Sequence, residues 1–125
     1  MFGFANPFSG GNAVRSLSAQ DAVAKSNAGD ITLVDVRDHN EIAMTGKAKG
    51  ALHIPLSVLN FKADPKHPEF HPELDTSKPI AVYCASGARS QMAGQALSRL
   101  GFSEVYNIGG FMHWQAAGGA AEKAA

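Results

Sequence analysis

The residues best suited to chemistry are a cysteine and the six residues that follow it. These seven residues, the Cys84 loop, are Cys84, Ala85, Ser86, Gly87, Ala88, Arg89 and Ser90. The apolar run 80–83 before them is typical of a buried strand, and apolar residues recur at helical spacing after Ser90. A loop that leads from the carboxyl end of a parallel strand into a helix turns backbone N–H groups inward and binds anions. This context predicts a reactive thiolate at Cys84.

The composition of the Cys84 loop supports the same interpretation. Small residues at 85–88 allow a tight backbone curl, and Gly87 can adopt a positive φ without steric cost. Arg89 adds a permanent positive charge, which favours the thiolate, the nucleophilic form of a cysteine. The hydroxyls of Ser86 and Ser90 are expected either to donate hydrogen bonds to the site or to cap the helix that begins at Ser90. A lone cysteine is more often a small buried hydrophobe, so the prediction depends on the strand-loop-helix context.

The rest of the chain alternates between expected strands and helices. Apolar or β-branched runs predict strands at 31–36, 51–54, 79–83 and 105–108. Helical spacing and capping residues predict helices at 19–28, from Asp38 to Gly46, from Ser90 to Gly101 and around 112–116. Four prolines between Asn60 and Pro79 indicate a surface loop with at most one helical turn. This alternation predicts an α/β protein with a mostly parallel sheet and helices on both faces.

Length and composition limit the classes of function. The 125 residues are the size of one domain, and 11 basic residues balance 11 acidic ones, which disfavours a nucleic-acid partner. The single cysteine excludes an internal disulfide and a zinc site of several thiolates. The apolar runs are too short for a membrane span, and the start of the chain matches a secretory signal poorly. We therefore expect a cytoplasmic protein that does not enter a membrane.

Domain boundaries follow from the distribution of small and polar residues. We expect a flexible N-terminal arm at 1–14, a single domain at 15–119 and a disordered C-terminal tail at 120–125. The arm contains three phenylalanines, which could pack on the domain or on a second copy. The expected assembly is a monomer or a weak homodimer.

Several motifs together resemble the rhodanese-like sulfurtransferase family in its single-domain form. The resemblance covers roughly residues 15–119. The motifs are Leu33-Val34-Asp35-Val36-Arg37 with Glu41, the run from Gly50 to Leu56, the run from Val82 to Ser90, Leu100-Gly101-Phe102, and Gly109-Gly110-Phe111 with Trp114 and Ala117-Gly118. One position departs from the family pattern, because Lys47 stands where the family usually has a histidine.

The resemblance implies the rhodanese-like α/β fold, with a central, mostly parallel five-stranded sheet and helices on both faces. It also implies that Cys84 takes a sulfane sulfur from a donor such as thiosulfate, holds it as a persulfide and passes it to a thiol, cyanide or protein acceptor, without a cofactor. The residues at 85–90 would then bind the persulfide. Arg89 and the helix that follows the loop would supply positive potential.

Two other functions remain open. The first is a sulfur-relay or binding module that passes sulfur to one docked protein without efficient turnover. The second is a phosphatase or arsenate reductase in which Cys84 attacks an oxyanion. Related phosphatases of the cell-cycle dual-specificity type have a loop one residue longer, which favours sulfur here, and their chemistry needs a general acid, for which Asp64 and Asp75 are weak candidates.

The remaining polar and aromatic candidates favour structural roles. Asp35 and Arg37 should lie near the same crevice as Cys84 and are expected to support it, as an ion pair with Glu41 or as a loop anchor. His67 and His71, with Glu69 between them, have the spacing of a helical metal site, but Pro68 and Pro72 interrupt it, so no metal site is predicted. Phe111 and Trp114 could line the mouth of the site, although core packing is the commoner use of such aromatics.

Overall fold

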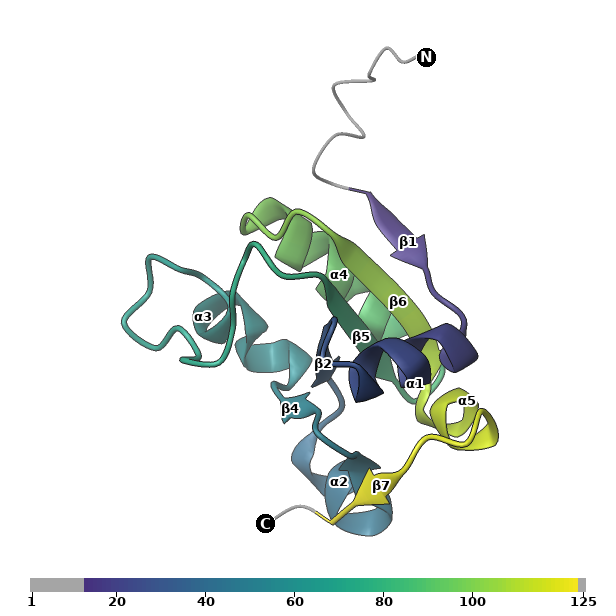
Figure 1. Ribbon diagram of the computed structural model, residues 1–125. Helices are drawn as coiled ribbons and strands as arrows, with labels where there is room; N and C mark the ends of the chain where they lie inside the picture. The colour runs from purple at the N-terminus through teal and green to yellow at the C-terminus, as the bar shows by residue number, and fades with distance from the viewer. Residues whose placement is uncertain (1–12, 124–125) are drawn as a thin grey trace, which may run out of the picture.

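The computed structural model describes residues 13–123. It contains a parallel sheet with helices on both faces, as Figure 1 shows. The helices and strands are, in chain order, β1 Val14–Ser16, α1 Ala19–Asn27, β2 Thr32–Asp35, α2 His39–Thr45, β3 Lys47–Ala48, β4 Leu52–His53, η1 Leu56–Val58, α3 Leu59–Lys62, β5 Ile80–Cys84, α4 Ala88–Arg99, β6 Val105–Gly110, α5 Phe111–Ala116 and β7 Ala121–Glu122.

The main sheet has five strands in the order β1-β6-β5-β2-β4, and every pairing in it is parallel. This confirms the predicted fold class. β5 lies at the centre of the sheet, and all five of its residues are buried. A central parallel strand is covered on both faces, which explains why its sequence, Ile-Ala-Val-Tyr-Cys, is continuously apolar.

Alternating side chains of β5 contribute to two separate hydrophobic clusters. Ile80, Val82 and Cys84 belong to the cluster that includes residues of α3 and α4, whereas Ala81 and Tyr83 belong to the cluster of α1 and α5. This period of two is the ordinary geometry of a strand. The Cys84 side chain therefore points to the α4 face of the sheet, where the helix that follows it begins.

The ends of the domain differ from the sequence-based boundaries. The first strand, β1, pairs with β6 and begins at Val14, inside the expected arm; residues 1–12 lie outside the described residues. The expected disordered tail is wrong for the described part of that segment, because β7 pairs antiparallel with β3. A carboxylate at Glu122 accepts from Lys47 Nζ at 2.5 Å and from the Gly50 N–H at 3.2 Å, and these contacts hold the short strand in place.

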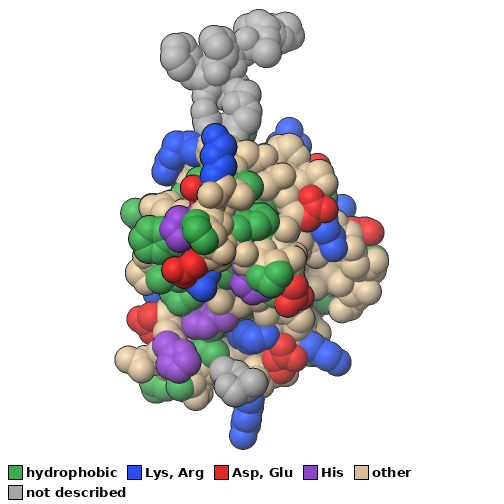
Figure 2. Space-filling view, turned by 90° about the vertical axis from the view of Figure 1, so that its left-hand side faces the viewer, with side chains coloured by type: hydrophobic (Ala, Val, Ile, Leu, Met, Phe, Trp, Pro, Cys, Tyr) green, Lys and Arg blue, Asp and Glu red, His purple; other side chains and the backbone are tan. Residues whose placement is uncertain are grey.

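The surface carries mixed charge. On the face that holds α3 and the long loop after it, Figure 2 shows basic, acidic and histidine side chains interspersed with small hydrophobic patches. Within residues 13–123, no helix is long and apolar enough to cross a membrane.

Candidate active site

The Cys84 sulfur lies at the carboxyl end of β5 and faces a ring of hydrogen-bond donors. The backbone N–H of Gly87 donates to Sγ at 3.0 Å, and the backbone N–H of Ser90 donates to it at 3.4 Å. The Ser90 hydroxyl oxygen also lies 3.4 Å from Sγ. The Cys84 side chain is only 1% exposed, so these protein donors replace the water that would otherwise solvate a sulfur anion.

These donors change the acidity of the thiol. Burial alone would raise the pKa of Cys84, but hydrogen bonds from the Ser90 hydroxyl and from the backbone of Ser90, Gly87 and Ser86 outweigh it and lower the pKa below its ordinary value. The favoured species near neutral pH is therefore shifted toward the thiolate. A stabilised thiolate is the form that attacks an electrophilic sulfur or phosphorus.

Two glycines allow the loop to close so tightly. Gly87 has φ +111°, in the left-handed region, and is the N-cap of α4. Gly110 pairs with Cys84 across the β5–β6 ladder, and a Cβ on it would lie 2.2 Å from the Ala85 carbonyl oxygen. A side chain at Gly87 would be strained by this positive φ, and one at Gly110 would displace the loop backbone. The two glycines thus fix the donors in their present positions.

The helix after the loop begins earlier than the sequence predicts. α4 starts at Ala88, so Ser90 lies in its first turn and does not open it. The Ser90 side chain is fully buried and turned inward, between Cys84 Sγ and Asn107. Ser90 therefore does not act as the cap, and its hydroxyl is directed toward the site.

Asn107 is a site residue that the sequence analysis missed. Its Oδ1 lies 2.7 Å from Ser90 Oγ and accepts the Gly109 N–H at 2.9 Å, while its Nδ2 donates to the Gly87 carbonyl at 3.1 Å. A hydroxyl has one proton, so Asn107 Oδ1, the Gly87 carbonyl and Cys84 Sγ compete for that of Ser90. The available signal was an amide side chain within the apolar strand run Val-Tyr-Asn-Ile.

Arg89 is held by Glu41 and not by the sulfur. Its Nη1 and Nη2 donate to the two carboxylate oxygens of Glu41 at 2.6 and 2.8 Å, in a bidentate pair that joins the loop to α2. The hydrogen bonds from Arg89 lower the pKa of Glu41 from 4.5 to about 2, and Glu41 in turn raises the pKa of Arg89. The positive charge expected beside Cys84 is therefore balanced by a neighbouring carboxylate.

Asp35 and Arg37 form an ion pair with each other, so of the two roles expected for them the structure shows a loop anchor and not an ion pair with Glu41. Both side chains are buried, at 0% and 3% exposure, and Arg37 Nη2 lies 2.8 Å from Asp35 Oδ2. Arg37 also donates to Thr45 Oγ1 and to the Gly46 carbonyl, at the end of α2. None of the hydrogen bonds of this pair reaches residues 84–90, and the pair anchors the β2–α2 loop.

The other sequence candidates also have structural contacts. His67 and His71 each accept the backbone N–H two residues ahead through Nδ1, and within residues 13–123 no group of three or more His, Cys, Asp or Glu side chains could hold a metal ion. Phe111 and Trp114 are buried, which confirms core packing. Asp64 and Asp75 accept hydrogen bonds within their own turns, and those from Ser77 lower the pKa of Asp75, which disfavours it as a proton donor.

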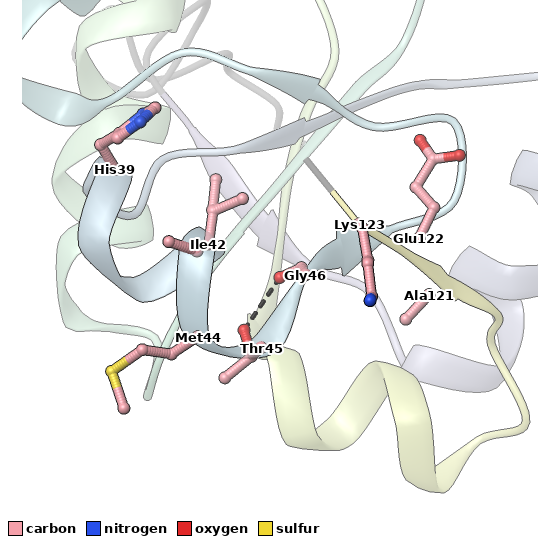
Figure 3. Close-up of a pocket in the computed structure, with 9 residues that line it drawn as sticks. His39, Ile42, Met44, Thr45, Gly46, Ala121, Glu122 and Lys123 are labelled. Carbon is pink, nitrogen blue, oxygen red and sulfur yellow. Dashed lines mark hydrogen bonds between the residues drawn. The ribbon is translucent and has the colours of Figure 1, made fainter. Parts of the chain in front are cut away.

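Two surface hollows flank this region. One borders the Cys84 loop and is lined by Ser86 and Gly87 of that loop, by Gln91 of α4, and by residues at the carboxyl ends of β1 and β6. The other lies between α2 and β7, where Figure 3 shows Ile42 and Thr45 across from Glu122 and Lys123. This second hollow is lined by no residue of the Cys84 loop, whereas the first is lined by two of them, Ser86 and Gly87.

Comparison with known protein families gives one match to a family model. Residues 18–117 match the model of the rhodanese-like domain. Among similar proteins of known sequence, the thiosulfate sulfurtransferase GlpE of Coxiella burnetii is 36% identical over 104 residues, which cover 82% of this chain and 86% of that protein. The uncharacterized protein YqhL of Bacillus subtilis is 40% identical over 83 residues, which cover 66% of this chain but 59% of its own length.

Solved structures show the same fold. A protein of unknown function from Rhodopseudomonas palustris, described as a possible tyrosine phosphatase, has a TM-score of 0.78 and 36% identity, covering 87% of this chain and 85% of that one. The human single-domain sulfurtransferase TSTD1 has a TM-score of 0.71, covering 83% and 97% of the two chains. Its 24% identity supports likeness of fold alone.

Proposed function

The chain belongs to the rhodanese-like domain family, and from that premise we propose that it is a sulfurtransferase that carries sulfur on Cys84. The observation that carries the proposal is the convergence of the Gly87 N–H, the Ser90 N–H and the Ser90 hydroxyl on one sulfur atom. Donors fixed around a single atom stabilise a sulfur anion before and after transfer.

The proposed reaction has two steps. The Cys84 thiolate attacks the outer sulfur of thiosulfate, the sulfur–sulfur bond of the donor breaks, and sulfite leaves with the bonding electron pair. The product is a Cys84 persulfide anion. In the second step a thiolate, cyanide or a protein acceptor attacks the terminal sulfur, and Cys84 leaves as the thiolate, so that cyanide yields thiocyanate and restores the starting enzyme.

Each loop residue has a proposed role in these steps. Cys84 is the nucleophile and sulfur carrier, and the backbone N–H groups of residues 85–90 bind the persulfide. The Ser90 hydroxyl donates to the sulfur when that atom is charged. Asp35 and Arg37 support the neighbouring loop through their buried pair and do not touch the reacting atoms.

The proposed setting follows from the chemistry of the sulfur. A single thiol that must alternate between thiolate and persulfide needs a reducing compartment, and we place the reaction in the cytoplasm. The donor is a small sulfane compound of the thiosulfate type. The acceptor is a thiol, cyanide or a protein.

Intact mass measurement tests the proposal. The purified protein is incubated with thiosulfate, desalted and weighed, beside a Cys84→Ser variant and a sample treated afterwards with cyanide. The expected result is a gain of one sulfur atom in the unaltered protein, lost again to cyanide and absent from Cys84→Ser. No gain in a folded protein would contradict sulfane transfer from thiosulfate.

An oxyanion enzyme is the second candidate, favoured by the 36% identical relative described as a possible tyrosine phosphatase. The same donors could hold a phosphate or arsenate oxygen while Cys84 attacks the central atom. Hydrolysis of an aryl phosphate that depends on Cys84, in a protein that gains no sulfur from thiosulfate, would support this function instead. Sulfur loading with poor turnover on every small acceptor would support a relay to one docked protein.

A further inference from the structure

We propose that Glu41 is a specificity-determining residue that cancels the charge of Arg89 and so makes the site favour sulfane donors with one negative charge or none over dianions such as thiosulfate. The inference deepens the proposed function and rests on it. It assigns the donor class to a residue that lies outside the Cys84 loop, on α2.

The carboxylate of Glu41 neutralises the charge of Arg89 within the Cys84 loop itself. Arg89 precedes Ser90, whose N–H and hydroxyl contact the sulfur, and both terminal nitrogens of Arg89 are engaged by the two oxygens of Glu41. A bidentate pair of this kind directs the guanidinium toward its carboxylate and occupies its best donors. The Arg89–Glu41 pair as a whole has no net charge, so it offers little positive potential to a ligand.

Glu41 is also held from its own helix, independently of Arg89. Its Oε1 accepts the Asp38 N–H at 3.1 Å, and its own N–H donates to the Asp38 carboxylate, which completes a capping box at the start of α2. The low pKa of Glu41 keeps it ionised throughout the neutral range. The Glu41 carboxylate is therefore held in one position beside the site, unlike a surface side chain that rotates freely.

The chemistry of the first step makes this charge matter. Attack of the Cys84 thiolate on thiosulfate brings a monoanion against a dianion, and the repulsion grows with the charge of the donor. The N–H groups around Sγ are dipoles that stabilise one sulfur atom, and they do not neutralise the distant sulfonate oxygens. The neighbouring cation Arg37 is likewise paired, with Asp35. An organic persulfide or a thiosulfonate meets less repulsion and delivers its sulfur to the same thiolate, with a thiolate or sulfinate as the leaving group.

A series of charge variants tests the inference with two donors. Thiosulfate carries two negative charges and benzenethiosulfonate carries one, and both transfer their outer sulfur. Glu41→Gln removes one negative charge while keeping the capping box, which accepts glutamine. It should raise kcat/KM by about tenfold for thiosulfate and about threefold for benzenethiosulfonate, because the logarithm of the effect scales with donor charge.

The reverse substitution should act in the opposite direction. Arg89→Gln leaves Glu41 uncompensated and should lower kcat/KM by about tenfold for thiosulfate and about threefold for benzenethiosulfonate. Adding Glu41→Gln to Arg89→Gln should recover most of that loss. Glu104→Gln is the matched control, because it makes the same charge change just before β6, at the end of that strand far from the Cys84 loop. It should leave kcat/KM unchanged for both donors.

Each outcome decides the question. A purely structural ion pair would make Glu41→Gln and Arg89→Gln lower kcat/KM equally for both donors, and that result would overturn the inference. Equal gains for the two donors would overturn it as well. If neither the unaltered protein nor any of the variants gained sulfur, the proposed function itself would be overturned. The intact mass measurement detects that outcome independently of the kinetic comparison.

The unaltered protein provides a second measurement that needs no variant. With Arg89 compensated, the thiolate and a dianionic donor repel, and added salt screens that repulsion. The kcat/KM for thiosulfate should therefore rise with ionic strength. A fall with ionic strength would show an uncompensated cation at the site and would overturn the role of Glu41.

Discussion

Two neighbouring parallel strands, β2 and β5, end at the same edge of the sheet and each leads into a helix, yet the loops after them differ in function. After β2, the Asp35 carboxylate accepts the Arg37 backbone N–H at 2.8 Å and the Arg37 side chain fills the remaining space. After β5, N–H groups converge on Cys84 Sγ. One loop encloses both an anion and its cation, and the other surrounds only a sulfur that can become an anion.

The difference shows that position at the carboxyl ends of parallel strands does not by itself make a site. Both loops occupy the place where ligands bind in open α/β sheets. The β2 loop is internally satisfied, because carboxylate and guanidinium neutralise each other. The β5 loop has donors in excess of its own acceptors, and that excess is what a transferred sulfur can use.

The largest expected effect comes from breaking the satisfied loop. Asp35→Asn leaves the buried Arg37 guanidinium without its counterion and should lower the free energy of unfolding by about 3 kcal/mol. Urea unfolding followed by circular dichroism measures this loss. Molecules that stay folded should still gain sulfur from thiosulfate.

A double variant is the control for this prediction. Asp35→Asn combined with Arg37→Met removes the unpaired buried charge and should recover part of the lost stability. If Asp35→Asn instead abolished sulfur loading in folded protein, the two loops would not be separable and the comparison would be wrong.

The next effect comes from crowding the open loop. Gly110→Ala places a Cβ 2.2 Å from the Ala85 carbonyl oxygen, so the loop backbone must move. We expect a loss of about 2 kcal/mol in unfolding free energy. Unlike Asp35→Asn, this variant should also slow sulfur loading in molecules that remain folded, as mass spectrometry over time would record. Unchanged loading would show that the loop tolerates displacement of its donors.

A third variant removes one donor without moving the backbone. Ser90→Ala deletes the hydroxyl 3.4 Å from Cys84 Sγ and keeps the Ser90 N–H. The pKa of Cys84 should rise, and sulfur loading near neutral pH should slow by about tenfold. The ultraviolet absorbance of the thiolate, followed against pH, measures the pKa in the folded protein. A pKa that stays in place would assign the acidity to the backbone alone.

Sequence patterns were sufficient to predict the strand, loop and helix around Cys84, because local hydrogen bonds determine them. The apolar run of β5 and the small residues after Cys84 predicted a strand, a tight loop and a helix. Only the exact start of α4 was wrong, because Gly87 with its positive φ caps the helix in place of a serine. Local spacing was enough for these features since their hydrogen bonds join residues a few positions apart.

Contacts between distant segments could not be predicted in this way. Arg89 and Glu41 are 48 positions apart, and Arg37 was an equally plausible cation to pair with Glu41. The choice depends on how β2 and β5 align, which places α2 beside the Cys84 loop. The two-residue strand β7 is too short to show a period, and its pairing depends on Lys47 and Glu122.

The smallest expected effect compares the two ion pairs through pH. The Arg89–Glu41 pair is partly exposed, at 37% and 30%, whereas the pair after β2 is buried, so solvent weakens the first far more. Because Arg89 holds the pKa of Glu41 at about 2 and its ordinary value is 4.5, the stabilisation is fully present above pH 4.5. It disappears as the pH falls from 4.5 toward 2.

Urea unfolding of the unaltered protein and of Glu41→Gln, each measured at neutral pH and near pH 2, isolates this contribution to the free energy of unfolding. On acidification the free energy of unfolding should fall by about 1 kcal/mol more for the unaltered protein than for the variant, because glutamine has no carboxylate to protonate. High salt at neutral pH should reduce the difference between the two proteins, since it screens an exposed pair. If acidification lowered the free energy of unfolding equally in both proteins, the Glu41 carboxylate would place a negative charge at the site without stabilising the fold. Its effect on the choice of donor would then be separate from any effect on structure.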